Sequence, residues 1–209
     1  MNSISVIIPC YNAEKLIIKN IKKVINKLNK NKNLYEIIIV NDGSTDRTLS
    51  EINKLKNSKI KIVSYKKNIG KSYAIRKGLE IAKYKNIIFI DCDLPYFEKF
   101  DMVIRKLETG FDFVSIDRKH KKSNLKNNKL NMYQFFRHIV GNIISKIIHL
   151  LLPLKLNTYD TQAGLKGIKV FKNFKKLNFF SNKFFLDLEL ICYFLKKKNF
   201  FILYLLNMK

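Results

Sequence analysis

Short apolar runs alternate with segments of helical spacing over the first half of this chain, and this alternation is the strongest constraint on its fold. Residues 35–40 (YEIIIV) and 86–90 (NIIFI) are rich in Ile, as strands buried on both faces are. Residues 14–28 instead place apolar side chains every three to four positions, which predicts a helix. We therefore predict an α/β fold with a mainly parallel sheet and helices on both faces. The predicted strands are residues 4–8, 35–40, 60–64, 86–90 and 112–116, and the predicted helices are 14–28, 45–55, 71–83 and one ending near residue 107.

The second half of the chain is organised differently and is strongly basic. The formal net charge is +25, of which +9 falls in residues 1–117 and +16 in residues 118–209. Such a charge suits nucleic acid, phosphate-bearing ligands or an anionic membrane, and a solvated lysine surface is the alternative. The predicted elements are a basic loop at 119–129, an amphipathic helix at 131–152, a loop at 158–164, a strand near 167–171, a helix near 184–197 and an apolar run at 200–206.

Polar motifs directly follow three of the predicted strands, at residues 9–12, 41–46 and 91–93. Ligands of parallel sheets bind outside the carboxyl ends of the strands, so we expect these motifs to lie together. Asp91 and Asp93 repel each other unless a cation or hydrogen bonds compensate, and Mg²⁺ or Mn²⁺ commonly bridges such carboxylates to substrate phosphates. The alternative is an acidic strand end that faces water.

Residues 41–46 (NDGSTD) combine turn chemistry with two aspartates. The turn places Gly43 at positive φ and Thr45 at the N-cap of the next helix. One turn does not need both aspartates, so Asp42 could instead hold the base or ribose of a nucleotide. Both interpretations stay open.

Several well-known sites are missing from the sequence. GxGxxG does not follow the first strand, and GxxxxGK[ST] does not occur, which argues against a dehydrogenase and a Walker-type ATPase. The chain also lacks the GxSxG of serine hydrolases and the HExxH of zinc proteases. It contains no uninterrupted apolar run of the length of a membrane span, so we predict no spanning helix.

Four motifs in the first half, in this order, resemble the family 2 glycosyltransferases of the GT-A fold. They are VIIPCYNAE, IIIVNDGSTDRT, NIGKSYAIRKG and IDCDLPY, and the resemblance covers residues 4 to about 118. Asp117–Arg118, Arg137 and the segments 160–166 (DTQAGLK) and 185–190 (FLDLEL) further resemble the polyprenyl-phosphate sugar transferases. The DTQxGxK string is most similar to the dolichyl-phosphate β-glucosyltransferase branch.

The resemblance implies one GT-A domain over residues 1–209 with a nucleotide-sugar half at 1–117 and an acceptor half at 118–209. In the donor half, Pro9 and Tyr11 would pack on the nucleotide base, and Asp42 would bind the base or ribose. Lys71 would lie near the nucleotide. Asp91 and Asp93 would hold Mg²⁺ or Mn²⁺ together with the donor diphosphate.

In the acceptor half, the resemblance places Arg118 and Arg137 at a lipid phosphate and Asp160 close to the reacting centre. The implied enzyme is an inverting hexosyltransferase that moves glucose from UDP-glucose onto a polyprenyl or dolichyl phosphate. We expect it to lie on the cytoplasmic face of a membrane as a peripheral protein, of the bacterial inner membrane or the endoplasmic reticulum. Helix 131–152 would then lie on the membrane surface, and a core helix packed on the sheet is the alternative.

Two other functions compete with this interpretation. The first is a family 2 transferase that acts on a saccharide or another cell-envelope acceptor. The second is a non-enzymatic, basic nucleic-acid-binding domain, which the charge favours although no recognised binding motif is present. We expect no nucleic-acid partner.

Overall fold

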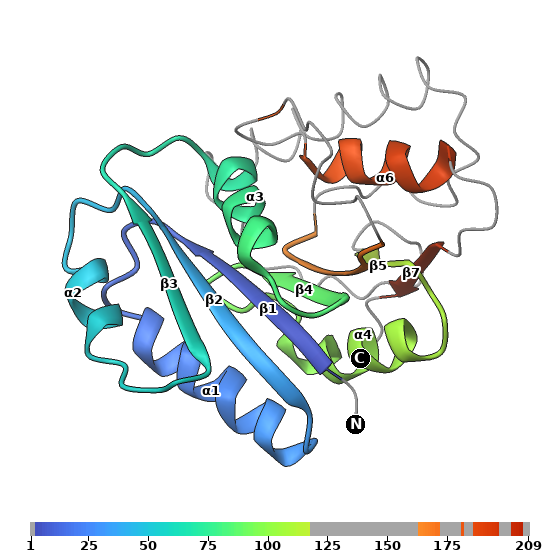
Figure 1. The fold of residues 1–209 in the computed structure, drawn as a ribbon, viewed down its shortest axis with the longest axis horizontal. Coiled ribbons are helices and arrows are strands. Elements are labelled where there is room, and N and C mark those ends of the chain that lie inside the picture. Colours follow the sequence, from blue (N-terminus) through green and yellow to red (C-terminus); the bar gives the residue numbers. More distant parts are fainter. Residues whose placement is uncertain (1–2, 118–162, 172–180, 182–185, 197–201, 207–209) are drawn as a thin grey trace, which may run out of the picture.

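One sheet of seven strands, in the order β3-β2-β1-β4-β6-β5-β7, runs through the molecule (Figure 1). The computed structural model describes residues 3–117, 163–171, 181, 186–196 and 202–206. The predicted helix 131–152 and the residues Arg118, Arg137 and Asp160 lie outside the described residues. The strands are β1 (Ser3–Cys10), β2 (Leu34–Asp42), β3 (Ile60–Tyr65), β4 (Asn86–Ile90), β5 (Phe113–Asp117), β6 (Leu165–Lys169) and β7 (Ile202–Leu206). The helices are α1 (Ile17–Lys30), α2 (Thr48–Asn53), α3 (Lys71–Ile81), α4 (Phe100–Glu108) and α6 (Leu186–Lys196), with a 3-10 turn at Phe97–Lys99.

The sheet is mainly parallel, as predicted, with one antiparallel strand in its interior. β1 pairs in parallel with β2 and β4, β2 with β3, and β5 with β7. β6 runs antiparallel between β4 and β5, with Leu165 opposite Ile90 and Lys169 opposite Asn86. A strand of the basic second half is therefore built into the same sheet as the first half.

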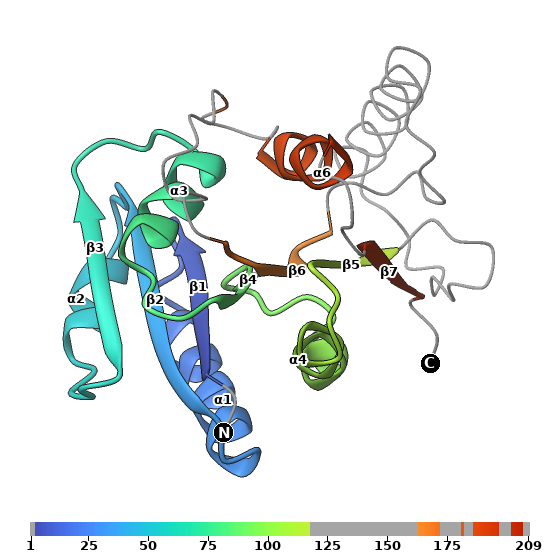
Figure 2. The same ribbon diagram turned by 45° about the vertical axis from the view of Figure 1, so that its right-hand side comes forward.

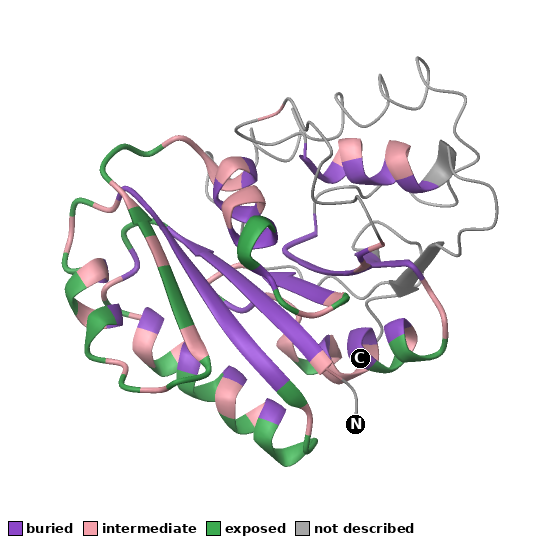
Figure 3. Ribbon diagram, in the orientation of Figure 1, coloured by how far each residue is buried: buried purple, intermediate pink, exposed green. Residues whose placement is uncertain are grey.

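Helices cover both faces of the sheet (Figure 2). One apolar cluster joins one face to α1, α2 and α4, and a second joins the other face to α3 and α6. β1 and β2 are buried along nearly their whole length, whereas β3 at the edge of the sheet is half exposed (Figure 3). Among the helices that the structure describes, none combines the length and the apolar character that crossing a membrane requires.

The predicted strands and helices of the first half are all present, but some of their ends differ. Thr45 is not the helix cap, because its amide donates to Asn12 Oδ1 at 2.8 Å and α2 begins only at Thr48. α3 ends at Ile81 rather than residue 83, because the amides of Lys83 and Tyr84 donate to side chains of the sheet. β6 begins two residues earlier than predicted.

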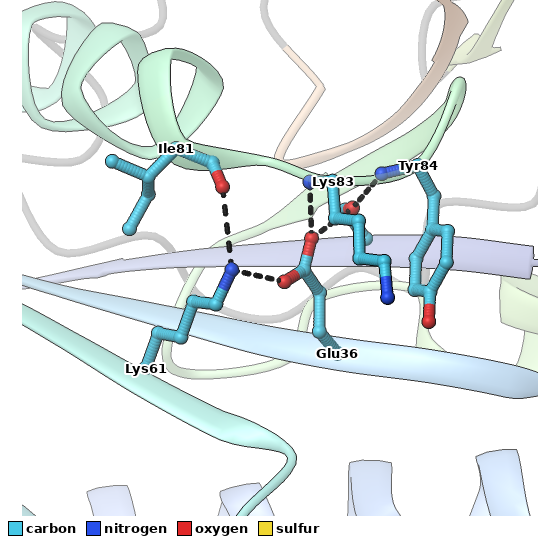
Figure 4. Close-up of polar contacts among 6 residues, drawn as sticks. Glu36, Lys61, Ile81, Lys83 and Tyr84 are labelled. Atoms are coloured by element: carbon cyan, nitrogen blue, oxygen red, sulfur yellow. Dashed lines mark hydrogen bonds and ion pairs between the residues drawn. The ribbon is translucent and has the colours of Figure 1, made fainter.

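Those two amides belong to a buried polar cluster centred on Glu36 (Figure 4). Glu36 accepts hydrogen bonds from the Ser5 hydroxyl at 2.6 Å and the Lys83 amide at 2.5 Å, and it pairs with Lys61 Nζ at 2.8 Å. Burial alone would raise the pKa of Glu36, but these donors outweigh it and hold that pKa below its ordinary value. The cluster fixes the turn between α3 and β4 to β1, β2 and β3.

The lowered pKa of Glu36 makes the stability of the fold depend on pH. The carboxylate stabilises the folded chain above its ordinary pKa of about 4.3, and this contribution is lost as pH falls through the lower folded pKa. We expect Glu36→Gln to lower the free energy of unfolding by about 1 kcal/mol at pH 7, because Lys61 is half exposed. Urea unfolding at pH 7 and at pH 3 measures this, with the surface variant Glu51→Gln as control. An equal loss at both pH values would contradict the assignment.

Candidate functional site

The loops that follow β1 and β2 are joined by hydrogen bonds at the carboxyl edge of the sheet. The amide of Asn12 donates to Ser44 Oγ at 3.0 Å, and the amide of Ala13 donates to Thr48 Oγ1 at 2.7 Å. Asp46 accepts from the amides of Glu14 and Thr48 at 3.1 and 2.9 Å. Two of the three predicted motifs therefore form one connected surface.

Asp42 at the end of β2 holds the turn that precedes α3. Its carboxylate is buried and accepts hydrogen bonds from the Asn68 side chain at 3.1 Å, the Ile69 amide at 2.9 Å and the Gly70 amide at 3.0 Å. Gly43 next to it has φ +64°, and a Cβ there would lie 2.4 Å from the Lys67 backbone carbon. This packing gives Asp42 a structural task, the placement of Lys71 at the start of α3.

Lys71 forms an ion pair with Asp91, which directly follows β4. Lys71 Nζ lies 2.5 Å from Asp91 Oδ1, and each side chain is one-third exposed. Burial alone would lower the pKa of Lys71, but the carboxylates of Asp91 and Asp187 outweigh it, so the pKa of the ammonium is raised. The NIGK and DCD motifs thus meet through opposite charges.

The glycine of the DTQAGLK segment packs against the same aspartate. The Asp91 amide donates to the Gly164 carbonyl at 3.0 Å. A Cβ on Gly164 would lie 2.6 Å from Asp91 Oδ2 and 2.6 Å from Pro95 Cγ. Only a glycine leaves room for Asp91 and its loop at this position.

Lys166 of the same segment is fully buried in β6 and pairs with the first turn of α6. Its Nζ lies 3.0 Å from Asp187 Oδ2 and also donates to the Ala163 carbonyl. The Leu186 amide donates to Ser72 Oγ at 3.4 Å, so the start of α6 sits on the first turn of α3 beside Lys71. The second half of the chain therefore reaches the site through β6 and α6.

The remaining predicted residues differ in how accessible they are. Tyr11 follows β1 and is 47% exposed, whereas Pro9 is buried within the strand. Asp93 is exposed, and Asn20 of α1 supports its loop by donating to the Cys92 carbonyl at 2.9 Å. Burial and the flanking carboxylates raise the pKa of Cys92 to about 11, so this thiol stays protonated at neutral pH and is a poor nucleophile.

The structure brings Asp42, Lys71 and Asp91 into one hydrogen-bonded and ion-paired system at this edge of the sheet. The part of the chain that the structure describes contains no group of three or more His, Cys, Asp or Glu residues arranged for a metal ion. Arg118, Arg137 and Asp160 are not among the described residues, so their roles stay predictions.

Residue roles at Gly164, Lys166 and Asp187 were not predicted from the sequence. The segments that contain them, DTQAGLK and FLDLEL, can be recognised in the sequence, but the contacts of each residue depend on where β6 and α6 lie. One usable signal is a lysine within an apolar strand (LKGIKV) followed by an acid in the first turn of an apolar helix. Lysine is almost never fully buried unless it is paired, so the two residues are candidates for one ion pair.

Comparison with known proteins assigns the family. Residues 5–167 match the family model described as Glycosyl transferase family 2. The chain belongs to glycosyltransferase family 2. It is therefore related to enzymes, and the non-enzymatic nucleic-acid-binding alternative is set aside.

Relatives of this glycosyltransferase family support the assignment. An uncharacterised glycosyltransferase of Synechocystis is 30% identical over 155 residues, which cover 72% of this chain and 46% of the relative. Dolichyl-phosphate β-glucosyltransferase of Drosophila melanogaster is 28% identical, over 78% of this chain and 53% of the relative. The chain spans about half the length of the curated relatives it matches.

A solved structure supports the fold. Glucosyl-3-phosphoglycerate synthase of Mycobacterium tuberculosis, crystallised with Mn²⁺, UDP and phosphoglyceric acid, aligns with a TM-score of 0.70 at 20% identity. The alignment covers 99% of this chain and 69% of that one. This glycosyltransferase has the GT-A fold that its motifs predict.

The close contact between Gly164 and Asp91 predicts a local effect of a single methyl group. We expect Gly164→Ala to displace the 91–95 loop and to lower the free energy of unfolding by about 1–3 kcal/mol. Hydrogen exchange should become faster at the Asp91 amide, which loses its bond to residue 164.

Gly167→Ala is the matched control, because its Cβ would meet Val103 Cγ1 at 2.6 Å and Leu107 on α4 instead. It should cost similar stability and leave exchange in the 91–95 loop unchanged. Equal effects of the two variants on that loop would contradict the specific contact.

Proposed function

We propose that this chain carries the transferase site of an inverting enzyme that moves glucose from UDP-glucose onto a polyprenyl or dolichyl phosphate. The observation that carries the proposal is the contact of Gly164 with Asp91, which joins the DTQAGLK segment to the DCD motif. A relative named dolichyl-phosphate β-glucosyltransferase supports the lipid-phosphate acceptor. UDP-glucose is proposed as the donor because the DTQAGLK segment resembles the dolichyl-phosphate β-glucosyltransferases.

In this proposal the donor binds over the carboxyl ends of β1, β2 and β4. Tyr11 offers an exposed ring for the base, and Pro9 supports the chain below it. The Asp42 carboxylate orients residues 68–70 by accepting their hydrogen bonds, and the resemblance assigns it the base or ribose as well. Lys71 would lie near the nucleotide.

Asp91 and Asp93 fit the divalent cation that the family implies. The Lys71 ammonium at Asp91 Oδ1 shows that this carboxylate already binds positive charge. Carboxylate oxygens suit Mg²⁺ and Mn²⁺, which are usually held by one or two carboxylates and completed by substrate phosphates and water. Such a cation stabilises the negative charge that develops on the leaving diphosphate.

The acceptor side of the proposal rests on Arg118, Arg137 and Asp160, which the resemblance assigns. A lipid phosphate is ionised near neutral pH, so it needs no strong general base. Two arginines can bind it through charge-assisted, bidentate hydrogen bonds. Helix 131–152, basic and amphipathic in sequence, would lie on the cytoplasmic membrane surface and present the lipid.

The direct test is incubation of the protein with radiolabelled UDP-glucose, GDP-mannose and short polyprenyl phosphates, with Mg²⁺ or Mn²⁺. Label in the lipid fraction from UDP-glucose supports the proposal, and label from GDP-mannose alone contradicts the donor. Transfer of label to a saccharide but not to the lipid would contradict the lipid-phosphate acceptor. It would favour the competing family 2 transferase that acts on a saccharide.

Asp91→Asn and Asp93→Asn should each abolish transfer and leave the melting temperature within a few degrees of wild type. Each removes a negative ligand from the cation and leaves the diphosphate charge uncompensated. Asp101→Asn, which breaks a surface pair between α4 and α1, is the control and should keep its activity. Full metal-dependent activity in both site variants would refute the assignment.

Arg118→Ala and Arg137→Ala should weaken use of the acceptor more than binding of the donor. Loss of one charge-assisted contact corresponds to a rise in KM for the lipid phosphate of about tenfold or more. Steady-state kinetics with each substrate varied in turn measures this, with the exposed Arg105→Ala on α4 as control. An unchanged KM for lipid phosphate with a collapse of donor binding would show that the roles are misassigned.

A further inference from the structure

Charged groups from four elements form a row that leads from the buried face of β6 to the carboxylate at the end of β4. Lys166 Nζ lies 3.0 Å from Asp187 Oδ2, and Lys71 Nζ lies 2.5 Å from Asp91 Oδ1. The two pairs are neighbours, because the Leu186 amide donates to Ser72 Oγ at 3.4 Å and these residues directly precede Asp187 and follow Lys71 in the chain. Charges therefore alternate along the row.

The two pairs differ in how freely their members can move. Lys166 is 1% exposed and its ammonium also donates to the Ala163 carbonyl, so it is fixed in the interior. Lys71 is one-third exposed and lies at the first residue of α3, on a flexible four-carbon stem. Only the second ammonium can change partner without unpacking the sheet.

A divalent cation at Asp91 must compete with the Lys71 ammonium, because both bind the same carboxylate. Like charges at one carboxylate repel, so the lysine must leave Oδ1 as the cation arrives. A displaced ammonium in a partly buried site needs another anionic partner. Asp187 follows Leu186, whose amide donates to Ser72 Oγ, so it is the α6 carboxylate next to the first turn of α3 where Lys71 lies.

We propose that Lys71 exchanges between Asp91 and Asp187, and that Lys166 is the positioning residue that holds Asp187 ready to receive it. The exchange would couple cation binding on β4 to α6 of the acceptor half. This exchange rests on the cation site of the proposed function. It adds that Asp187 becomes the partner of Lys71 when the cation binds to Asp91.

The test measures Mn²⁺ binding without nucleotide, by the electron paramagnetic resonance signal of free Mn²⁺. Lys166→Met/Asp187→Asn removes the second partner without leaving a buried charge, and should raise the Kd for Mn²⁺ about tenfold, the size of one charge-assisted contact. Lys71→Met removes the competitor and should lower that Kd by a similar factor. In the Lys71→Met background, the double substitution should change the Kd less than about twofold.

Lys61→Met/Glu36→Gln is the matched control, because it removes another carboxylate–lysine pair of the same sheet, on β2 and β3. It should cost stability and leave Mn²⁺ binding unchanged. Circular dichroism checks the fold of every variant. If the Lys166→Met/Asp187→Asn protein does not fold, Lys71→Met still tests the proposal, since unchanged or weaker Mn²⁺ binding in it rules out the competition on which the exchange depends.

The outcomes separate this inference from the function on which it rests. An equal loss of Mn²⁺ affinity from the double substitution with and without Lys71 would overturn the exchange and leave the cation site standing. Mn²⁺ binding that is insensitive to Asp91→Asn would overturn both.

Discussion

The antiparallel pairing of β6 with β4 is the contact on which the site depends. Leu165 lies opposite Ile90, so the residues that precede β6 arrive where β4 ends. The Gly164 carbonyl then accepts the Asp91 amide, and Lys166 follows on the face covered by α3 and α6. A parallel strand at this position would bring its last residues to this edge rather than its first. The direction of one strand therefore decides which segment of the second half meets the DCD motif.

The strands of the first half could be predicted because the sequence pattern that identifies them is local. Apolar runs rich in Ile and Val identify strands, and residues 86–90 agree with β4 at both ends. Parallel order then places three polar motifs at one edge, which is how Asp42 and Asp91 could be grouped in advance. Helix ends could not be predicted in the same way, since Glu36 ends α3 and Asn12 holds Thr45 from distant positions in the chain.

The roles of Lys166 and Asp187 show where sequence reasoning stops. The predicted strand near residues 167–171 leaves Lys166 outside it, whereas β6 begins at Leu165. Lys166 is instead fully buried, and its ammonium is satisfied there by Asp187 from α6 and by the Ala163 carbonyl. The sequence signal names the two residues as candidates for an ion pair, but their meeting depends on the packing of a strand and a helix on the same face, which local sequence does not encode.

Carboxylates are scarce in this chain, and the site uses them in two physically different ways. Asp42 and Asp46 accept hydrogen bonds from backbone amides, which cannot leave without a change in the fold. Asp91 is paired with an ammonium on a flexible stem, which can leave while the backbone stays in place. The first kind shapes the loops and the second can respond to a ligand. In the proposed function a donor diphosphate and an acceptor phosphate would repel each other, so positive charge close to both would favour their binding. Lys71, which is paired with Asp91 and lies next to the start of α6, is an ammonium on a flexible stem at this boundary between the two halves of the chain.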